Sequence, residues 1–126
     1  MKQLFLLFSH TLTNGQKIDA KNSLHADRFI SLPSDLQRLW SNIPENDKDI
    51  SSYLLPLKKY LKLHANKGDF VLIQGDFGGV YDMVNFSKEI GLIPVHSTTK
   101  REIQEQTIGN EVKKISTFKH VIYRRY

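Results

Sequence analysis

The sequence contains no cysteine among its 126 residues. That absence excludes disulfide bonds, thiolate metal sites and a cysteine nucleophile, and it is typical of proteins in the reducing cytoplasm. No apolar run approaches the roughly 20 residues that a membrane-spanning helix requires. Residues 4–8 are apolar, but Ser9 and His10 follow in place of a signal-peptide cleavage site. We therefore expect a buried first strand there, and a cytoplasmic protein.

Several catalytic signatures are missing as well. The chain has no GxxxxGK[ST] phosphate loop, no GxGxxG dinucleotide fingerprint and no GxSxG nucleophile elbow. The five histidines show no HxxxH or HxH spacing, and no cluster of acidic residues accompanies them. These absences disfavour P-loop enzymes, dehydrogenases and serine hydrolases. We expect neither a metal ion nor a cofactor.

The positive charge is concentrated near the end of the chain. The formal net charge is +5, and residues 100–126 alone carry seven Lys or Arg and three Glu. A localised basic segment favours an anionic partner. It is equally typical of a Lys-rich edge strand that resists aggregation, and charge alone does not decide between the two.

The sequence alternates apolar runs with segments of helical spacing. Strands are predicted at residues 3–8, 28–32, 70–74 and 92–96, and helices at about 14–25, from 33–34 to about 41, at 50–65 and at 80–90. Pro94 suggests that its strand lies toward the sheet edge. The residues after Lys100 predict a β-hairpin with its turn at Gly109 and Asn110. This order predicts a single α/β domain over residues 1–126, with a mostly parallel sheet flanked by helices and a C-terminal β-hairpin.

Three polar segments follow predicted strands. They are residues 9–11, residues 75–79 and residues 97–101. Because ligands of open parallel sheets bind beyond the carboxyl ends of the strands, we expect the three segments to meet at one edge. Their hydroxyls, glycine backbone, helix N-terminus and cations are the groups that bind phosphate.

The glycine-rich segment is the second of these. Gly75, Gly78 and Gly79 can adopt positive φ and let a ligand approach the backbone. The alternative is a tight strand-to-helix turn without a ligand. Asp76 is unfavourable for an anion, so we expect it to cap the following helix or to contact a ribose hydroxyl.

The third segment, Ser97-Thr98-Thr99-Lys100-Arg101, places three hydroxyls and two cations directly after an apolar strand. Its alternative interpretation is a solvated loop that enters the hairpin. A lone histidine is more often structural than catalytic. His10 and, less so, His120 are functional candidates, whereas His25 and His64 are interpreted as structural. Aromatic residues also interleave with basic ones over residues 118–126, a pattern that suits either base stacking or a hairpin core with a charged outer face.

Together these segments resemble a known family. Leu6-Leu7-Phe8-Ser9-His10, Leu39-Trp40-Ser41-Asn42-Ile43-Pro44, the QGDFG of residues 74–78, Gly91-Leu92-Ile93-Pro94, the STTKR of residues 97–101 and Phe118-Lys119-His120-Val121 resemble the small CRISPR-associated proteins of the Csx type, which accompany type III systems. The resemblance covers nearly the whole chain and implies a Rossmann-like, CARF-like fold. It also implies a homodimer that binds cyclic oligoadenylate and, as a ring nuclease, cleaves cyclic tetra-adenylate to switch off antiviral signalling.

The implied chemistry needs no metal ion, because the ribose 2′-hydroxyl can attack the neighbouring phosphorus. Under the resemblance the candidate catalytic residues are Ser9, His10, Lys100 and Arg101, with His10 as the group that moves a proton. The candidate ligand-binding residues are Thr11, Gln74, Gly75, Asp76, Phe77, Gly78, Gly79, Ser97, Thr98, Thr99 and His120. The hairpin either joins the dimer interface or closes over the ring. We expect no membrane and no DNA partner.

Two other functions remain open at this point. The first is a binding module without catalysis, a sensor or sponge for the same cyclic oligoadenylate. The second is a general RNA-binding module that uses the basic hairpin, which predicts affinity for linear nucleic acid that falls steeply with salt.

Overall fold

The computed structural model describes residues 2–126, which form one five-stranded sheet with helices on both faces. Its elements run in the order β1 (Lys2–Leu7), α1 (Asn14–Ser23), β2 (Ala26–Ser31), α2 (Ser34–Ser41), α3 (Leu55–His64), β3 (Phe70–Ile73), α4 (Phe77–Glu89), β4 (Ile93–Ile108) and β5 (Glu111–Arg125). The strand order is β2-β1-β3-β4-β5, and only β5 runs antiparallel to its neighbour. The predicted mostly parallel α/β sheet with a C-terminal hairpin is confirmed.

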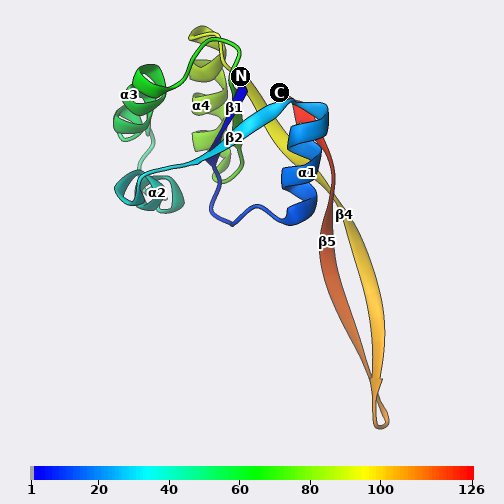
Figure 1. Ribbon diagram of the computed structural model, residues 1–126. Coiled ribbons are helices and arrows are strands. Elements are labelled where there is room, and N and C mark those ends of the chain that lie inside the picture. Colours follow the sequence, from blue (N-terminus) through cyan, green and yellow to red (C-terminus); the bar gives the residue numbers. More distant parts are fainter. Residues whose placement is uncertain (1) are drawn as a thin grey trace.

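The two faces of the sheet bury separate cores. Alternate residues of a strand point to opposite faces, so Phe5 and Leu7 of β1 join the core under α2, α3 and α4. Leu4 and Leu6 join the second core, under α1. Figure 1 shows α1 on one side of the sheet and the other three helices on the opposite side. Burial on both faces explains why β1 and β3 are continuously apolar.

Local signals fix the ends of the helices. Thr13 and Gln16 form the predicted capping box at the start of α1. Pro56 lies in the first turn of α3, where its missing N–H costs nothing. Asp76 caps α4 by accepting a hydrogen bond from the Gly79 N–H at 3.0 Å, so the capping role predicted for Asp76 is confirmed.

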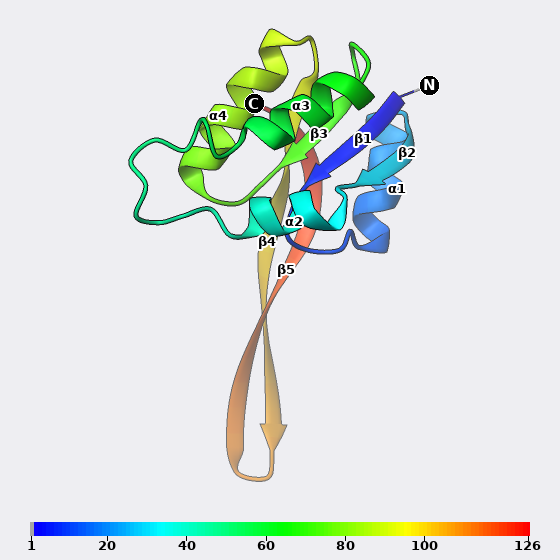
Figure 2. The same ribbon diagram turned by 90° about the vertical axis from the view of Figure 1, so that its left-hand side faces the viewer.

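Strands β4 and β5 extend far beyond the rest of the sheet. Their pairing continues from Val95 opposite Arg125 to Ile108 opposite Glu111, and Gly109 turns the chain with a φ of 63°. Figures 1 and 2 show the distal part as a twisted two-stranded ribbon that projects away from all the helices. We call residues 99–119 the arm and the remaining sheet with its helices the body. The predicted hairpin turn is confirmed, and the hairpin is longer than predicted.

Two of the predicted polar loops prove to be parts of regular elements. Residues 97–101 belong to β4, where β5 pairs with them apart from a register shift between Ser97 and Thr99. Gly78 and Gly79 belong to the first turn of α4, so the glycine-rich turn is shorter than predicted. A Cβ on Gly79 would lie 2.5 Å from Ile43 Cδ1 and 3.3 Å from the Trp40 ring, so a larger residue would have to displace the end of the Ile43 side chain.

Pro94 was expected in a strand toward the sheet edge, and β4 is the next-to-last strand, between β3 and β5. Pro94 is tolerated because the ladder between β4 and β5 starts one residue later, at Val95. In residues 2–126, no helix is long and apolar enough to cross a membrane.

Candidate functional site

A polar pocket of about 570 Å³ lies beyond the carboxyl ends of β1 and β2. It is lined by Leu6, Phe8, Ser9, His10, Thr11, Leu12, Lys17, Phe29, Ser31, Gln37 and Ser41. None of these lining residues is acidic, and Lys17 and His10 are the titratable groups among them. The pocket is therefore suited to an anion with some apolar surface.

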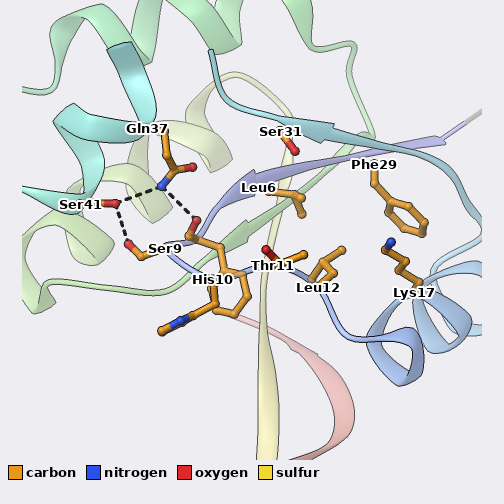
Figure 3. A pocket seen from close by; sticks show the side chains of 11 residues that line it. Leu6, Ser9, His10, Thr11, Leu12, Lys17, Phe29, Ser31, Gln37 and Ser41 are labelled. Carbon is orange, nitrogen blue, oxygen red and sulfur yellow. Dashed lines mark hydrogen bonds between the residues drawn. The ribbon is translucent and has the colours of Figure 1, made fainter. Parts of the chain in front are cut away.

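One end of the pocket is held by a small hydrogen-bond network between β1 and α2. Gln37 donates its side-chain N–H to the Phe8 carbonyl at 3.1 Å and to the Ser41 hydroxyl at 3.0 Å. The hydroxyls of Ser41 and Ser9 are 2.9 Å apart. Figure 3 shows these three side chains gathered at one end of the pocket, linked by the dashed bonds. Gln37 and Ser41 meet because they lie one turn apart on α2.

Lys17 and His10 are the basic side chains of the pocket, and they lie at different ends of it. Lys17 comes from the first turns of α1, and Figure 3 places it beside Phe29 of β2. His10 is exposed and packs edge-on against the Phe8 ring, with ring centroids 5.3 Å apart. An exposed imidazole is able to exchange protons with a bound ligand.

A second, smaller hollow of about 230 Å³ continues toward β3, lined by Phe8, Ser9, His10, Gln74 and Gly75. The backbone carbonyl of Gln74 accepts a hydrogen bond from the Trp40 indole at 3.2 Å. The side chain of Gln74 is also engaged, since its carbonyl accepts the Ser97 N–H at 2.8 Å. The structure thus brings the first predicted polar segment and the start of the second one together, as expected.

The N-terminus of α4 offers less to an anion than predicted. The Asp76 carboxylate is bound to the Gly79 N–H, where it places a negative charge at the helix end. Gly78 and Gly79 lie in the first turn of α4 and do not form a separate ligand-binding loop. Phe77, however, is 94% exposed at this edge of the sheet. An aromatic ring this exposed is free to stack on a nucleobase.

The base of the arm contains a chain of three polar side chains. The Ser97 hydroxyl lies 2.5 Å from His120 Nδ1, and His120 Nε2 lies 2.7 Å from Asp19 Oδ2. When the imidazole is neutral, Asp19 accepts from Nε2–H and Nδ1 is left to accept the Ser97 proton. We call Asp19, His120 and Ser97 the clasp, because they join α1 to both strands of the hairpin.

The clasp has the residue types of a nucleophilic triad, but its setting is structural. Ser97 is only 7% exposed and lines neither hollow. Tyr123 packs against His120 with ring centroids 4.7 Å apart and donates its hydroxyl to the Gln16 carbonyl. Burial, with a smaller contribution from the Asp19 charge, raises the pKa of Tyr123 to about 12. These contacts fasten the arm to α1.

The remaining predicted site residues lie on the arm or at its base, away from the pocket lining. Thr98 exchanges two hydrogen bonds with the backbone of Ile122, and Thr99 is exposed opposite His120. Lys100 and Arg101 are exposed too, and the Arg101 guanidinium donates to the Ser116 hydroxyl at 2.9 and 3.2 Å. Because β4 is parallel to β1 and β3, these residues leave the sheet at the edge that carries the pocket.

The sequence analysis missed five residues that the structure places at the pocket or the clasp: Lys17, Asp19, Ser31, Gln37 and Ser41. The spacing of Gln37 and Ser41 puts them on one helical face. Nothing in the sequence indicated that this face points to the end of β1. Within residues 2–126 no group of three His, Cys, Asp or Glu side chains could hold a metal ion.

The fold and the pocket define a mostly parallel α/β protein with a polar, acid-free pocket at its strand ends. The chain belongs to the family described as the uncharacterized protein MJ1673 family, whose model matches residues 2–124. It is 50% identical over 126 residues to the protein MJ1673 of Methanocaldococcus jannaschii, covering all of this chain and 98% of that protein. No solved structure matches the chain.

Proposed function

We propose that the protein is a metal-independent ring nuclease that opens a cyclic oligoadenylate, with cyclic tetra-adenylate as its expected substrate. The observation that carries the proposal is the pocket, which combines hydroxyls, one lysine and one exposed histidine without any acidic side chain. The Csx-type resemblance, with its CARF-like, Rossmann-like fold, supplies the identity of the ligand and the link to type III antiviral signalling. A pocket of about 570 Å³ would take part of such a ring, with the rest extending over the strand ends.

The reaction needs alignment and proton transfer. A ribose 2′-oxygen attacks the adjacent phosphorus while its proton passes to His10, and the bond to the 5′-oxygen breaks. That oxygen takes up a proton, so the product is a linear oligoadenylate with a 2′,3′-cyclic phosphate and a 5′-hydroxyl. No water or metal ion is consumed, and the protein's task is to hold the two reacting atoms in line.

The charge that develops on the phosphate oxygens requires nearby donors. Lys17, Ser9 and Thr11 line the pocket at the strand ends and would supply them. Lys100 and Arg101 lie at the base of the arm, so under this proposal they attract the part of the ring outside the pocket. Phe77 would stack on one of its adenines.

A binding module without catalysis is the second candidate function. The same pocket supports it, because every group named above would also bind an intact ring. The general RNA-binding module stays a third candidate, and it would use the basic arm in place of the pocket.

A single-turnover assay distinguishes these functions. Excess protein is mixed with radiolabelled cyclic tetra-adenylate in EDTA, and the products are resolved by chromatography. Linear products that end in 2′,3′-cyclic phosphate support the ring nuclease. An intact ring that co-elutes with the protein supports the sensor or sponge, and an intact ring that does not bind overturns both.

The variants of this assay separate binding from turnover. We expect His10→Ala to retain ring binding and to lose about 10²–10⁴-fold in rate, the usual contribution of a positioned acid or base. Lys17→Ala should weaken binding as well. The matched control is His64→Ala, which removes an exposed histidine from the last turn of α3, far from the pocket lining. Equal losses in His10→Ala and His64→Ala would exclude His10 from the chemistry.

A further inference from the structure

The arm exposes more apolar surface than an isolated ribbon can sustain. On one face lie Ile103, Val112 and Phe118, which are 57%, 60% and 70% exposed. On the other face Ile108 and Ile115 are 59% and 40% exposed. A two-stranded ribbon is marginally stable in water, and an exposed edge strand is a template for pairing. The exposed side chains and the open edges together indicate that the arm pairs with a partner.

The outer edge of β5 is the surface available for pairing. Strand β5 is the last strand of the sheet, and within residues 2–126 no other strand pairs with its outer edge. Strand β4 has a free edge only in the arm, because β3 occupies that edge as far as Val95. An antiparallel partner can therefore lie along β5 without meeting the body.

Two copies of one strand that pair antiparallel are related by a two-fold axis, and the axis must pass beside one residue that faces itself. Side chains that face each other then lie on the same side of the sheet. We call the residue beside the two-fold axis the centre of the pairing. Only a few residues of the arm can be the centre, and the charges that face each other differ from one centre to the next. Centres at residues 113 and 114 place a lysine against itself, and a centre at residue 116 places Lys113 opposite the partner's Lys119.

A centre at Ile115 gives complementary contacts throughout the arm strand. In this register apolar residues face apolar residues, in the pairs Ile115 with the partner's Ile115 and Val112 with the partner's Phe118. Opposite charges also face each other, in the pair Glu111 with the partner's Lys119. Two-fold symmetry repeats the last two pairs. No other centre from residue 113 to 117 pairs both the charges and the apolar side chains.

We propose that the outer edge of β5 is a self-pairing surface, through which a second copy of this chain joins antiparallel with Ile115 on the two-fold axis. The register has a consequence for the base of the arm, because it sets the partner's Asn110 opposite His120. Each arm tip then lies beside the clasp of the other chain. The inference rests on the arm alone and does not depend on the ring-nuclease proposal.

The absence of cysteine makes this surface testable by single-cysteine crosslinking. Ile115→Cys places two thiols directly across the axis, within the roughly 7 Å limit of Cα separation that a disulfide tolerates. Gln104→Cys is the matched control, since Gln104 is the neighbour of Ile115 on the same arm face. Two Gln104 residues would be about 14 Å apart, three strand spacings, and would not be bridged.

Under mild oxidation we expect Ile115→Cys to form a covalent dimer and Gln104→Cys to remain monomeric on a non-reducing gel. Equal crosslinking of the two variants would overturn the proposal. Crosslinking of Ile103→Cys without that of Ile115→Cys would overturn it too, because it would assign the surface to the edge of β4. Protection of the arm by linear RNA, with no Ile115→Cys dimer, would assign the arm to nucleic acid and overturn it likewise.

A charge exchange tests the register independently. Glu111→Lys sets two pairs of lysines against each other, and we expect self-association about tenfold weaker by sedimentation equilibrium. Lys119→Glu should have a similar effect. The double variant restores both opposite pairs and should recover the wild-type affinity. Additive losses in the double variant would contradict the register.

Discussion

The body and the arm both carry large apolar side chains but use them in opposite ways. In the body, Phe5, Leu7, Val71 and their neighbours are almost fully buried on both faces of the sheet. In the arm, which is the same sheet continued, every large apolar side chain is 40% exposed or more. The difference shows that backbone pairing alone continues a strand, whereas layers of helices are needed to bury it. Burial under helices stabilises the body, whereas the apolar side chains of the arm stay exposed.

Core truncation should show the largest contrast between the two regions. Phe5→Ala removes a side chain that is 1% exposed and packs edge-on to Tyr60, so we expect the free energy of unfolding to fall by about 3–5 kcal/mol. Phe118→Ala should change it by less than about 0.5 kcal/mol at dilute protein concentration. Urea unfolding measures both. Similar losses would mean that the arm is packed like the body.

The clasp joins the two regions, and cutting it should have the next largest effect. His120→Ala leaves Asp19 and Ser97 without their shared partner, and we expect a loss of about 1–3 kcal/mol in local stability. Hydrogen exchange should accelerate at residues 97–99 and 120–125 and stay unchanged in β1 and β3. Lys119→Ala, the exposed neighbouring residue, is the control at protein concentrations dilute enough to keep the chain monomeric. Uniform acceleration throughout the body would show that the clasp supports the whole fold.

Alkaline pH should weaken the same junction through Tyr123. Its pKa is raised from 10.0 to about 12, so the folded state retains the phenol proton more tightly than the unfolded chain does. The resulting stability is fully present below pH 10 and is lost as the pH rises toward 12. Solvent screening at this half-buried site limits the loss to about 1–2 kcal/mol. Tyr123→Phe should reduce the alkaline slope of unfolding free energy. Tyr60 and Tyr126, whose pKa values burial also raises, would leave a residual slope.

The tip of the arm should show the smallest effect. Gly109 has a φ of 63° and open space around it, so Gly109→Ala is strained without being crowded. We expect a change of about 1 kcal/mol or less, seen as faster hydrogen exchange at residues 106–112 only. Gly109→Asn should be milder, since asparagine tolerates this backbone conformation. Any effect of Gly109→Ala on exchange in the body would argue against the independence of the two regions.

Much of the fold was predictable because its signals are local. Two-sided burial produced continuous apolar runs at β1 and β3, and the Thr13–Gln16 pair marked the start of α1. Residues 97–101 were interpreted as a loop because they are polar. They form a strand only because they pair with β5, which lies about twenty residues later in the chain. The strand-end prediction found Ser9, His10, Thr11, Gln74 and Gly75. It missed the contribution of α2, because the placement of a helix over a sheet edge is decided by tertiary packing.

The clasp was not predictable from the sequence for a related reason. Asp19 and His120 are 101 residues apart, and neither belongs to a motif. Only the position of α1 beside the base of the hairpin brings them together. His120 was singled out from its place in the basic hairpin, and the structure gives it a polar environment for which the sequence offers no signal.

Helix α1 carries both Lys17, which lines the pocket, and Asp19, which holds His120. A pocket residue and a clasp residue are thus only two positions apart on the same helix. If a displacement of the arm shifts α1, it alters the affinity of the pocket, and thermodynamic reciprocity requires a pocket ligand to alter the arm's contacts by the same factor. Under the two proposals the helix would then couple ligand occupancy to assembly, and the coupling would be measured as a ligand-dependent shift in the dimerisation constant.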